Sequence, residues 1–270
     1  MERLVLKVGS AVLTQDGKIA HRRLDNLVEF IAQLKEKYDV ILVSSGAVAA
    51  GYTALQLDKT EVSNKQVLAS IGQPLLMHTY RTEFAKYEIV CSQVLLEASI
   101  FKDATRLSHA KEAIDVMLLN GVVPIINEND VTAVEELVFG DNDQLSAYIT
   151  HYFCADMLAI LTDIDGFYDE NPHENQNAKL QKIVSSINPE LLTQKHSANS
   201  EFATGGIVTK LKAADFLIQN NNKMFLSSGF DLTYAKEFLL EGNHKNGTIF
   251  KAPSDEFINE HLKNVIRVDN

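Results

Sequence analysis

Strand-length runs of apolar residues limit the fold of this chain more than any other feature of its sequence. Such runs cover residues 39–44, 121–127 and 157–162, with few polar residues among them. A strand with one face in water alternates apolar and polar residues, whereas a strand covered by helices on both faces is apolar almost throughout. We therefore predict a parallel sheet that is buried on both sides.

Helical patterns separate these strands. Apolar residues recur at helical spacing from Leu24 to Leu34, directly before the strand at 39–44. Further helical patterns cover residues 67–87, 107–119, 145–154 and 208–220. Strands that alternate with helices indicate an α/β fold, a three-layer αβα sandwich around a mainly parallel sheet. Ligands of such sheets bind at the carboxyl ends of the strands.

The length of 270 residues suits one continuous domain with two lobes. We place the boundary near residue 155, which gives an N-terminal lobe of residues 1–155 and a C-terminal lobe of residues 156–270. The net charge of −11, with no basic cluster, argues against a nucleic-acid partner. No run approaches the roughly 18 apolar residues of a membrane span, so we expect no membrane insertion.

The two cysteines, Cys91 and Cys154, lie in segments that are predicted to be buried. We interpret them as small core residues and expect no disulfide. The N-terminus lacks the long apolar run of a secretory signal. These features favour a reducing compartment, the cytoplasm.

Two lysines occupy positions that are unfavourable for a positive charge. Lys7 lies within the apolar strand Leu4–Val8, where a buried ammonium group is costly unless it meets negative charge. Considered without Lys210, Lys7 fits a second interpretation equally well: a lysine at the end of a strand whose side chain extends to solvent. Lys210 falls in the first turn of a predicted helix, where the helix dipole disfavours a cation. A bound anion at that terminus would compensate the placement of Lys210, and a negative group is expected near Lys7.

Glycine-rich and acidic turns follow the predicted strands. Residues 140–143 read Gly-Asp-Asn-Asp, and one of these three Asx residues would suffice as a helix cap. Lysines, glycine-rich turns and carboxylates together indicate a polyphosphate with magnesium. The chain has no P-loop and no G-x-G-x-x-G motif, and its histidines do not pair at metal-ligand spacing, so we predict no protein-bound metal.

Six motifs in a fixed order show that the chain resembles the amino-acid kinase family. They are residues 6–10 (Leu-Lys-Val-Gly-Ser), 43–51 (Val-Ser-Ser-Gly-Ala-Val-Ala-Ala-Gly), 124–130 (Pro-Ile-Ile-Asn-Glu-Asn-Asp), 140–143, 161–163 (Leu-Thr-Asp) and 204–211. Within the family, these motifs look like the member that acts on L-glutamate, over those for acetylglutamate, carbamate, aspartate or uridylate.

The resemblance implies ATP-dependent phosphorylation of the γ-carboxylate of L-glutamate, the first step of proline biosynthesis. The products are L-glutamyl 5-phosphate and ADP, and Mg²⁺ accompanies the ATP phosphates. Lys7, Lys210 and Asp143 are implied as catalytic residues: the lysines approach the transferred phosphoryl group, and Asp143 holds the two lysines.

The resemblance also assigns binding residues to the two lobes. The glutamate-binding residues, in the N-terminal lobe, are Ser45, Gly46, Asn127, Asp130 and Asn142. The ATP-binding residues, mostly in the C-terminal lobe, are Lys7, Gly9, Ser10, Thr162, Asp163, Thr204, Gly205, Gly206 and Lys210.

Family members imply several partners. Proline is an expected feedback inhibitor, a homodimer or homotetramer is the expected assembly, and the next enzyme of the pathway is a possible recipient of the product. Many members carry a C-terminal PUA domain, and we expect none here. Two other functions stay open: a kinase for another small carboxylate on the same fold, and a non-catalytic module that binds an effector.

Overall fold

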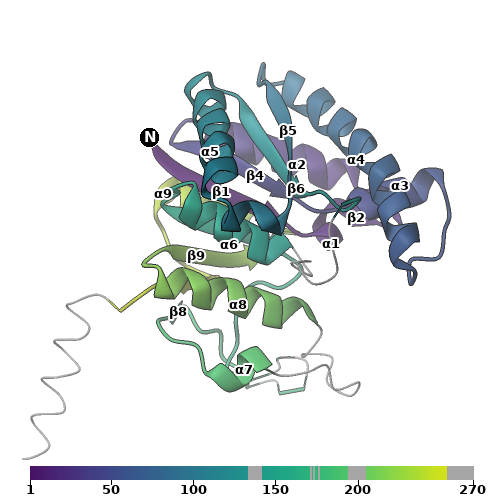
Figure 1. The fold of residues 1–270 in the computed structure, drawn as a ribbon. Helices are drawn as coiled ribbons and strands as arrows, with labels where there is room; N and C mark the ends of the chain where they lie inside the picture. The colour runs from purple at the N-terminus through teal and green to yellow at the C-terminus, as the bar shows by residue number, and fades with distance from the viewer. Residues whose placement is uncertain (133–141, 171, 173, 176, 194–204, 254–270) are drawn as a thin grey trace, which may run out of the picture.

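An eight-stranded sheet forms the centre of the molecule (Figure 1). The computed structural model describes residues 1–132, 142–170, 172, 174–175, 177–193 and 205–253. The strand order is β5-β6-β4-β1-β7-β9-β10-β8. The bounds of these strands in chain order are β1 Glu2–Val8, β4 Tyr38–Ser44, β5 Cys91–Leu96, β6 Val123–Glu128, β7 Met157–Thr162, β8 Ile183–Val184, β9 Lys223–Ser228 and β10 Thr248–Phe250. A separate two-stranded sheet pairs β2 Thr14–Gln15 with β3 Lys18–Ile19.

The sheet is mainly parallel, as predicted. β1 lies at its middle and pairs in parallel with both β4 and β7. One pair departs from this pattern, because β10 runs antiparallel to β9. The carboxyl ends of β1, β4, β6 and β7 therefore meet at one edge, where the loops that carry the predicted site begin.

Helices cover both faces of the sheet. Their bounds are α1 Ser10–Leu13, α2 His21–Leu34, α3 Ala47–Ala54, α4 Val62–Ala85, α5 Ala104–Leu119, α6 Asn142–Tyr152, α7 Pro189–Thr193, α8 Gly205–Gln219 and α9 Thr233–Glu241, with a 3-10 helix at Ala98–Lys102. Figure 1 shows α5, α6 and α8 in front of the sheet and α2 behind it. This is the three-layer arrangement that the apolar strands predict.

Two apolar cores fill the space between the layers. One core joins the sheet to α2, α4 and α9, and the other joins it to α5, α6 and α8. Side chains alternate between the cores along β1: Leu4, Leu6 and Val8 belong to the first core, and Val5 belongs to the second. By the same alternation Lys7 lies on the side of α6 and α8.

Helices α3 and α4 pack with their backbones almost in contact. A Cβ atom built on Gly72 would lie 1.8 Å from the carbonyl oxygen of Ala47, and one on Gly51 would lie 1.9 Å from that of Leu68. Glycine is therefore required at both positions. Gly51, part of a family motif, serves this helix contact.

Several elements differ from the prediction. β5 and β9 are not apparent in the sequence pattern: β5 is an edge strand with polar residues, and β9 ends in two serines. Cys154 is exposed and has a φ of 55°, because the chain turns there after α6 ends. Cys91 is half-buried, so the interpretation of both cysteines as core residues is wrong for Cys154.

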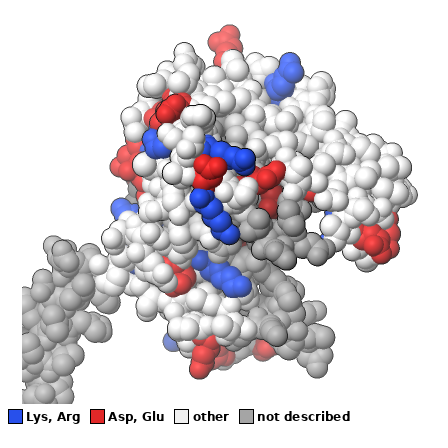
Figure 2. All heavy atoms as spheres, in the orientation of Figure 1, with Lys and Arg blue, Asp and Glu red and all other residues white. Residues whose placement is uncertain are grey.

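Charged side chains of both signs are mixed over the face drawn in Figure 2. Lysine and arginine side chains lie near the middle of that face, with acidic side chains beside them. Over the described part of the chain, no helix combines the length and apolarity that crossing a membrane requires.

Candidate active site

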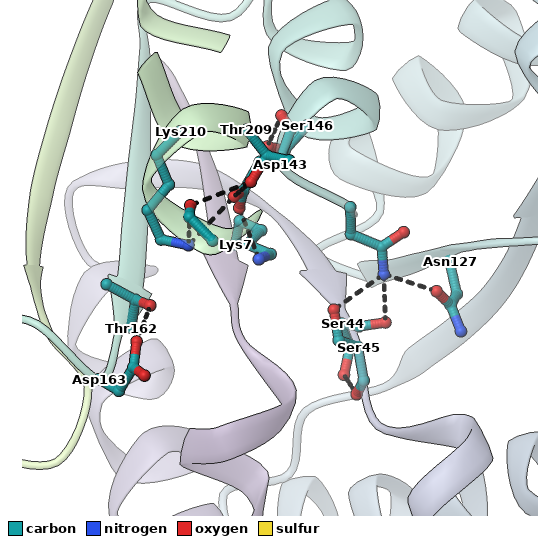
Figure 3. Close-up of polar contacts among 12 residues, drawn as sticks. Lys7, Ser44, Ser45, Asn127, Asp143, Ser146, Thr162, Asp163, Thr209 and Lys210 are labelled. Atoms are coloured by element: carbon teal, nitrogen blue, oxygen red, sulfur yellow. Dashed lines mark hydrogen bonds and ion pairs between the residues drawn. The ribbon is translucent and has the colours of Figure 1, made fainter. Parts of the chain in front are cut away.

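Three charged side chains meet inside the protein at the carboxyl edge of the sheet (Figure 3). Lys7 Nζ lies 2.5 Å from Asp143 Oδ1, and Lys210 Nζ lies 3.2 Å from Asp143 Oδ2. The side chains are 2%, 0% and 6% exposed for Lys7, Asp143 and Lys210. β1, α6 and α8 each contribute one of them. Two ammonium groups thus share one carboxylate, and ammonium groups held side by side suit an anionic ligand.

Further hydrogen bonds fix this group. Thr209 Oγ1 donates to Asp143 Oδ2 at 3.0 Å, and Lys210 Nζ donates to the carbonyl oxygen of Gly206 at 3.0 Å. Ser146 Oγ donates to the carbonyl oxygen of Asp143 at 2.7 Å, within α6. Each oxygen of the Asp143 carboxylate thus faces one lysine, and the lysine head groups have little freedom to move.

The position of Lys210 corrects one expectation. It is the sixth residue of α8 and so lies in the second turn, not the first. Its side chain nevertheless reaches back to Gly206 in the first turn, because helical side chains point toward the N-terminus of their helix. The ammonium group therefore still lies near the positive end of the helix dipole.

A second cluster, made of amide and hydroxyl groups, lies beside the first (Figure 3). Asn142 Nδ2 donates to Asn127 Oδ1 at 2.7 Å and to Ser45 Oγ at 3.0 Å, and it lies 3.3 Å from the carbonyl oxygen of Ser44. Behind it, the hydroxyl groups of Ser44 and Tyr80 are 2.8 Å apart. Burial raises the pKa of the Tyr80 hydroxyl, so it stays protonated. The structure thus brings together Ser45, Asn127 and Asn142, three predicted glutamate-binding residues.

Two other residues predicted to bind glutamate lie in nearby turns. Gly46 has a φ of 107°, a left-handed conformation that favours glycine, and it leads from β4 into α3. Asp130 follows β6 and is half-buried. Burial raises the pKa of its carboxyl group. An acidic group that is partly removed from water is a strong partner for a cationic ligand group.

The residues predicted to bind ATP lie around the ends of β1, β7 and the start of α8. Gly9 N donates to the carbonyl oxygen of Leu161 at 3.0 Å, which ties the turn after β1 to β7. Ser10 begins α1 and is exposed. Thr162 Oγ1 donates to Asp163 Oδ1 at 2.8 Å. Gly205 begins α8, followed by Gly206, whereas Thr204 lies outside the described residues, as do Gly140 and Asp141 of the acidic motif.

Sequence reasoning missed two residues that support these clusters. Thr209, beside Lys210 in a family motif, bonds to Asp143, and that adjacency was the only available signal. Gln73 accepts a hydrogen bond from Asn127 Nδ2 at 3.0 Å. Nothing in the pattern of α4 distinguishes Gln73 from a solvent-exposed polar residue. Within the described residues, no group of three or more histidine, cysteine or acidic side chains is arranged to hold a metal ion.

A cavity of about 790 Å³ lies at the opposite, amino-terminal edge of the sheet. Arg3, Lys111 and Asp115 are among its lining residues. Asp115 lies 2.8 Å from the Arg3 guanidinium and 2.9 Å from Lys111 Nζ, on its two carboxylate oxygens. These three side chains are 18–35% exposed, so water screens their charges. The buried group at the carboxyl edge is therefore the better candidate for a catalytic site.

Comparison with known proteins decides the family. The profile of the amino acid kinase family matches residues 2–226. The chain belongs to the amino acid kinase family. The motifs that resemble this family therefore identify it correctly, and the fold of its members is the fold observed here.

Similar proteins of this family include enzymes named glutamate 5-kinase. The one from Leishmania donovani is 53% identical over 250 residues, which cover 93% of this chain and 95% of that protein. The one from Wolinella succinogenes is 54% identical over 255 residues, which cover 93% and 98%. These matches span nearly the whole chain, and the family profile over residues 2–226 includes both clusters.

Solved structures support the fold alone. UMP kinase from Bacillus anthracis aligns with a TM-score of 0.64 over 94% of this chain and 97% of its own, at 16% identity. Carbamate kinase from Giardia lamblia aligns with a TM-score of 0.63 over 93% and 99%, also at 16% identity. Both are kinases of the same three-layer architecture, and their acceptors differ.

Proposed function

We propose that this protein transfers the γ-phosphoryl group of ATP to the γ-carboxylate of L-glutamate, which gives L-glutamyl 5-phosphate and ADP in the first step of proline biosynthesis. The observation that carries the proposal is the buried group of two lysines on one aspartate. The relatives named glutamate 5-kinase, at 53% and 54% identity, support the choice of acceptor.

Catalysis here requires positioning and charge neutralisation. A carboxylate is already a nucleophile, so the acceptor needs no general base. Negative charge develops on the oxygens of the transferred phosphoryl group, and Lys7 and Lys210 would face it from β1 and from α8. Asp143 keeps both ammonium groups in place before the substrate arrives, which avoids reorganisation during the reaction.

The amide and hydroxyl cluster forms the acceptor side of the proposed site. Ser45, Gly46, Asn127 and Asn142 surround the ends of β4 and β6. Asp130, whose pKa is raised by burial, would pair as a carboxylate with the α-ammonium group of glutamate.

ATP would bind along the turns after β1 and β7 and at the start of α8. Lys7, Gly9, Ser10, Thr162 and Asp163 come from the first two turns. Gly205, Gly206 and Lys210 come from α8, and Thr204 precedes it. The two ammonium groups of the buried group fit a polyphosphate. Mg²⁺, carried on the ATP phosphates, would neutralise part of their charge.

This proposal divides the chain near residue 155. Residues 1–155 hold the acceptor side, and residues 156–270 hold most of the nucleotide side. Proline shares the α-amino and α-carboxyl groups of glutamate, so it would compete at the acceptor side. A homodimer or homotetramer and delivery of the product to the next enzyme of the pathway complete the proposal on the basis of the family resemblance.

The test is an acceptor screen with purified protein and Mg-ATP. ADP release is measured with L-glutamate, N-acetylglutamate, aspartate, carbamate and UMP, and hydroxylamine traps any acyl phosphate as a hydroxamate. We expect ADP and hydroxamate with L-glutamate, and inhibition by added proline.

Other results would change the assignment. Turnover with a different acceptor would keep the phosphate side and reject the proposed acceptor. ATP binding without turnover of any acceptor would indicate a non-catalytic module.

A further inference from the structure

A row of side-chain amides continues from the acceptor-side cluster through the protein. Asn142 Nδ2 donates to Asn127 Oδ1, and Asn127 Nδ2 donates in turn to Gln73 Oε1 at 3.0 Å. Gln73 Nε2 then donates to Gln93 Oε1 at 3.2 Å. Gln73 is buried on α4, and Gln93 is exposed on β5. Three amide–amide hydrogen bonds therefore link α6, β6, α4 and β5.

The direction of this row is determined by one backbone group. An amide side chain has nearly the same shape after a half turn, so its partners decide which end carries the oxygen. The backbone N–H of Glu128 lies 2.9 Å from Asn127 Oδ1, and a backbone N–H can only donate. Asn127 must therefore keep its oxygen at this place and its nitrogen toward Gln73. Gln73 Oε1 is the acceptor that this orientation requires.

The same constraint extends to Asn142. Asn127 Oδ1 receives the amide nitrogen of Asn142, and Ser45 Oγ lies at 3.0 Å from that nitrogen as well. With its nitrogen used in this way, Asn142 can offer only its oxygen to a ligand. An amide oxygen accepts hydrogen bonds, so it suits an ammonium group and not a carboxylate.

We propose that Gln73 is a positioning residue that makes the acceptor side selective for a substrate with an amino group. This inference rests on the proposed function. Gln73 holds the amide of Asn127, and Asn127 holds Asn142 with its oxygen toward the α-ammonium group of the acceptor. Without the acceptor atom of Gln73, the buried nitrogen of Asn127 loses its partner. The Glu128 N–H and the Ser44 carbonyl oxygen must then hold Asn127 and Asn142 alone, so both amides are placed less firmly.

The test compares L-glutamate with glutarate, the same dicarboxylate without the amino group. In Gln73→Met, which keeps the length of the side chain but removes the amide, we expect the KM for L-glutamate to rise about threefold to tenfold. The KM for glutarate, the KM for ATP and kcat should stay within about twofold of wild type, because the substitution removes the acceptor of a single hydrogen bond from Asn127. The preference for glutamate over glutarate therefore falls.

The matched control is Gln93→Met, at the exposed end of the row. It should leave the preference unchanged, because Asn127 keeps its partner. Gln73→Glu retains an acceptor for Asn127 and is the second variant, which covers a failure of Gln73→Met to fold. Its carboxylate disfavours both dicarboxylates alike, so the preference should remain as in wild type.

Several results would overturn the inference. An unchanged preference in Gln73→Met would do so, as would equal losses for glutamate, glutarate and ATP, which indicate general loosening. A lost preference in Gln73→Glu would also contradict it.

An NMR measurement separates this inference from the proposed function. If wild-type protein phosphorylates neither dicarboxylate, the proposed function fails, and side-chain amide spectra still decide the role of Gln73. The Asn127 and Asn142 signals should move in Gln73→Met and not in Gln93→Met. Signals that stay in place in Gln73→Met would refute the positioning role whatever the activity.

Discussion

Removal of the negative charge from the buried group should destabilise the protein strongly. In Asp143→Asn, Lys7 and Lys210 keep their positive charges but lose the carboxylate that lies 2.5 Å and 3.2 Å from them. Removal of one partner from a buried ion pair costs about 3–5 kcal/mol, because the remaining charge stays buried without compensation. The free energy of unfolding of a domain is about 5–15 kcal/mol, so the variant should lose a large share of its stability.

The assay is urea unfolding followed by circular dichroism at pH 7, with Asp115→Asn as the matched control. Asp115 also bridges two cations, Arg3 at 2.8 Å and Lys111 at 2.9 Å, but its side chain is 32% exposed. Exposed pairs contribute about 0–1 kcal/mol, so the control should unfold close to wild type. The two aspartates thus share their contact geometry and differ in burial.

A double variant sharpens the test. Adding Lys7→Met to Asp143→Asn removes one of the two uncompensated cations, so part of the lost free energy of unfolding should return. If Asp143→Asn lost less than about 1 kcal/mol, or no more than Asp115→Asn, the argument from buried charge would be wrong.

Three other variants test separate parts of the structure. Lys210→Ala should lower kcat by about 100-fold or more while the KM for glutamate stays nearly constant, because the charge that Lys210 stabilises grows toward the transition state. Lys212→Ala, which is exposed on the same helix, is the control. A near-wild-type kcat of Lys210→Ala in initial-rate assays would refute the role. Burial holds the pKa of Asp130 above that of an aspartate in the unfolded chain, so this group binds more protons in the folded protein than in the unfolded one. Its contribution to stability therefore falls as the pH rises through the range between the two pKa values. Asp130→Asn should therefore unfold at a higher urea concentration than wild type at pH 7, lose this advantage in acid and raise the KM for glutamate; equal midpoints at neutral pH would contradict the sign. Gly72→Ala should lower the free energy of unfolding by about 1–3 kcal/mol or more, because its Cβ would lie 1.8 Å from a carbonyl oxygen. Ser70→Ala, at an exposed position of the same helix, should not lower it. Equal stabilities of the two variants in thermal or urea unfolding would refute the close contact.

Much of the fold could be predicted because a strand that is buried on both faces has a nearly continuous run of apolar residues. The strands at 39–44 and 157–162 are apolar over residues 40–43 and 157–161 and were found within one residue of their bounds. β5 has no such run, because it is an edge strand that includes the polar residues Ser92 and Gln93 and buries less apolar surface. β9 is apolar only at residues 224–226, too short a run to separate a strand from a helix segment.

The site could be predicted only in part from the residues themselves. Lys7 is conspicuous because its strand is otherwise apolar, so a negative partner could be expected without knowing which one. That partner, Asp143, is far away in the sequence, and only the packing of α6 against the sheet brings it to Lys7. Gln73 is beyond local reasoning, because the face that α4 turns inward depends on its contact with α3 through Gly51 and Gly72.

The first two residues of α6 join the two clusters of the site. Asn142 bonds to Ser45 and Asn127 in the amide cluster, and Asp143 bonds to Lys7 and Lys210 in the charged group. Consecutive Cα atoms are about 3.8 Å apart whatever the fold does, so the peptide bond itself sets the spacing of the two clusters. A phosphoryl acceptor held by one cluster and a phosphate held by the other would therefore meet at a distance that loop motion hardly changes. The start of α6 thus provides the positioning that a reaction without a general base requires.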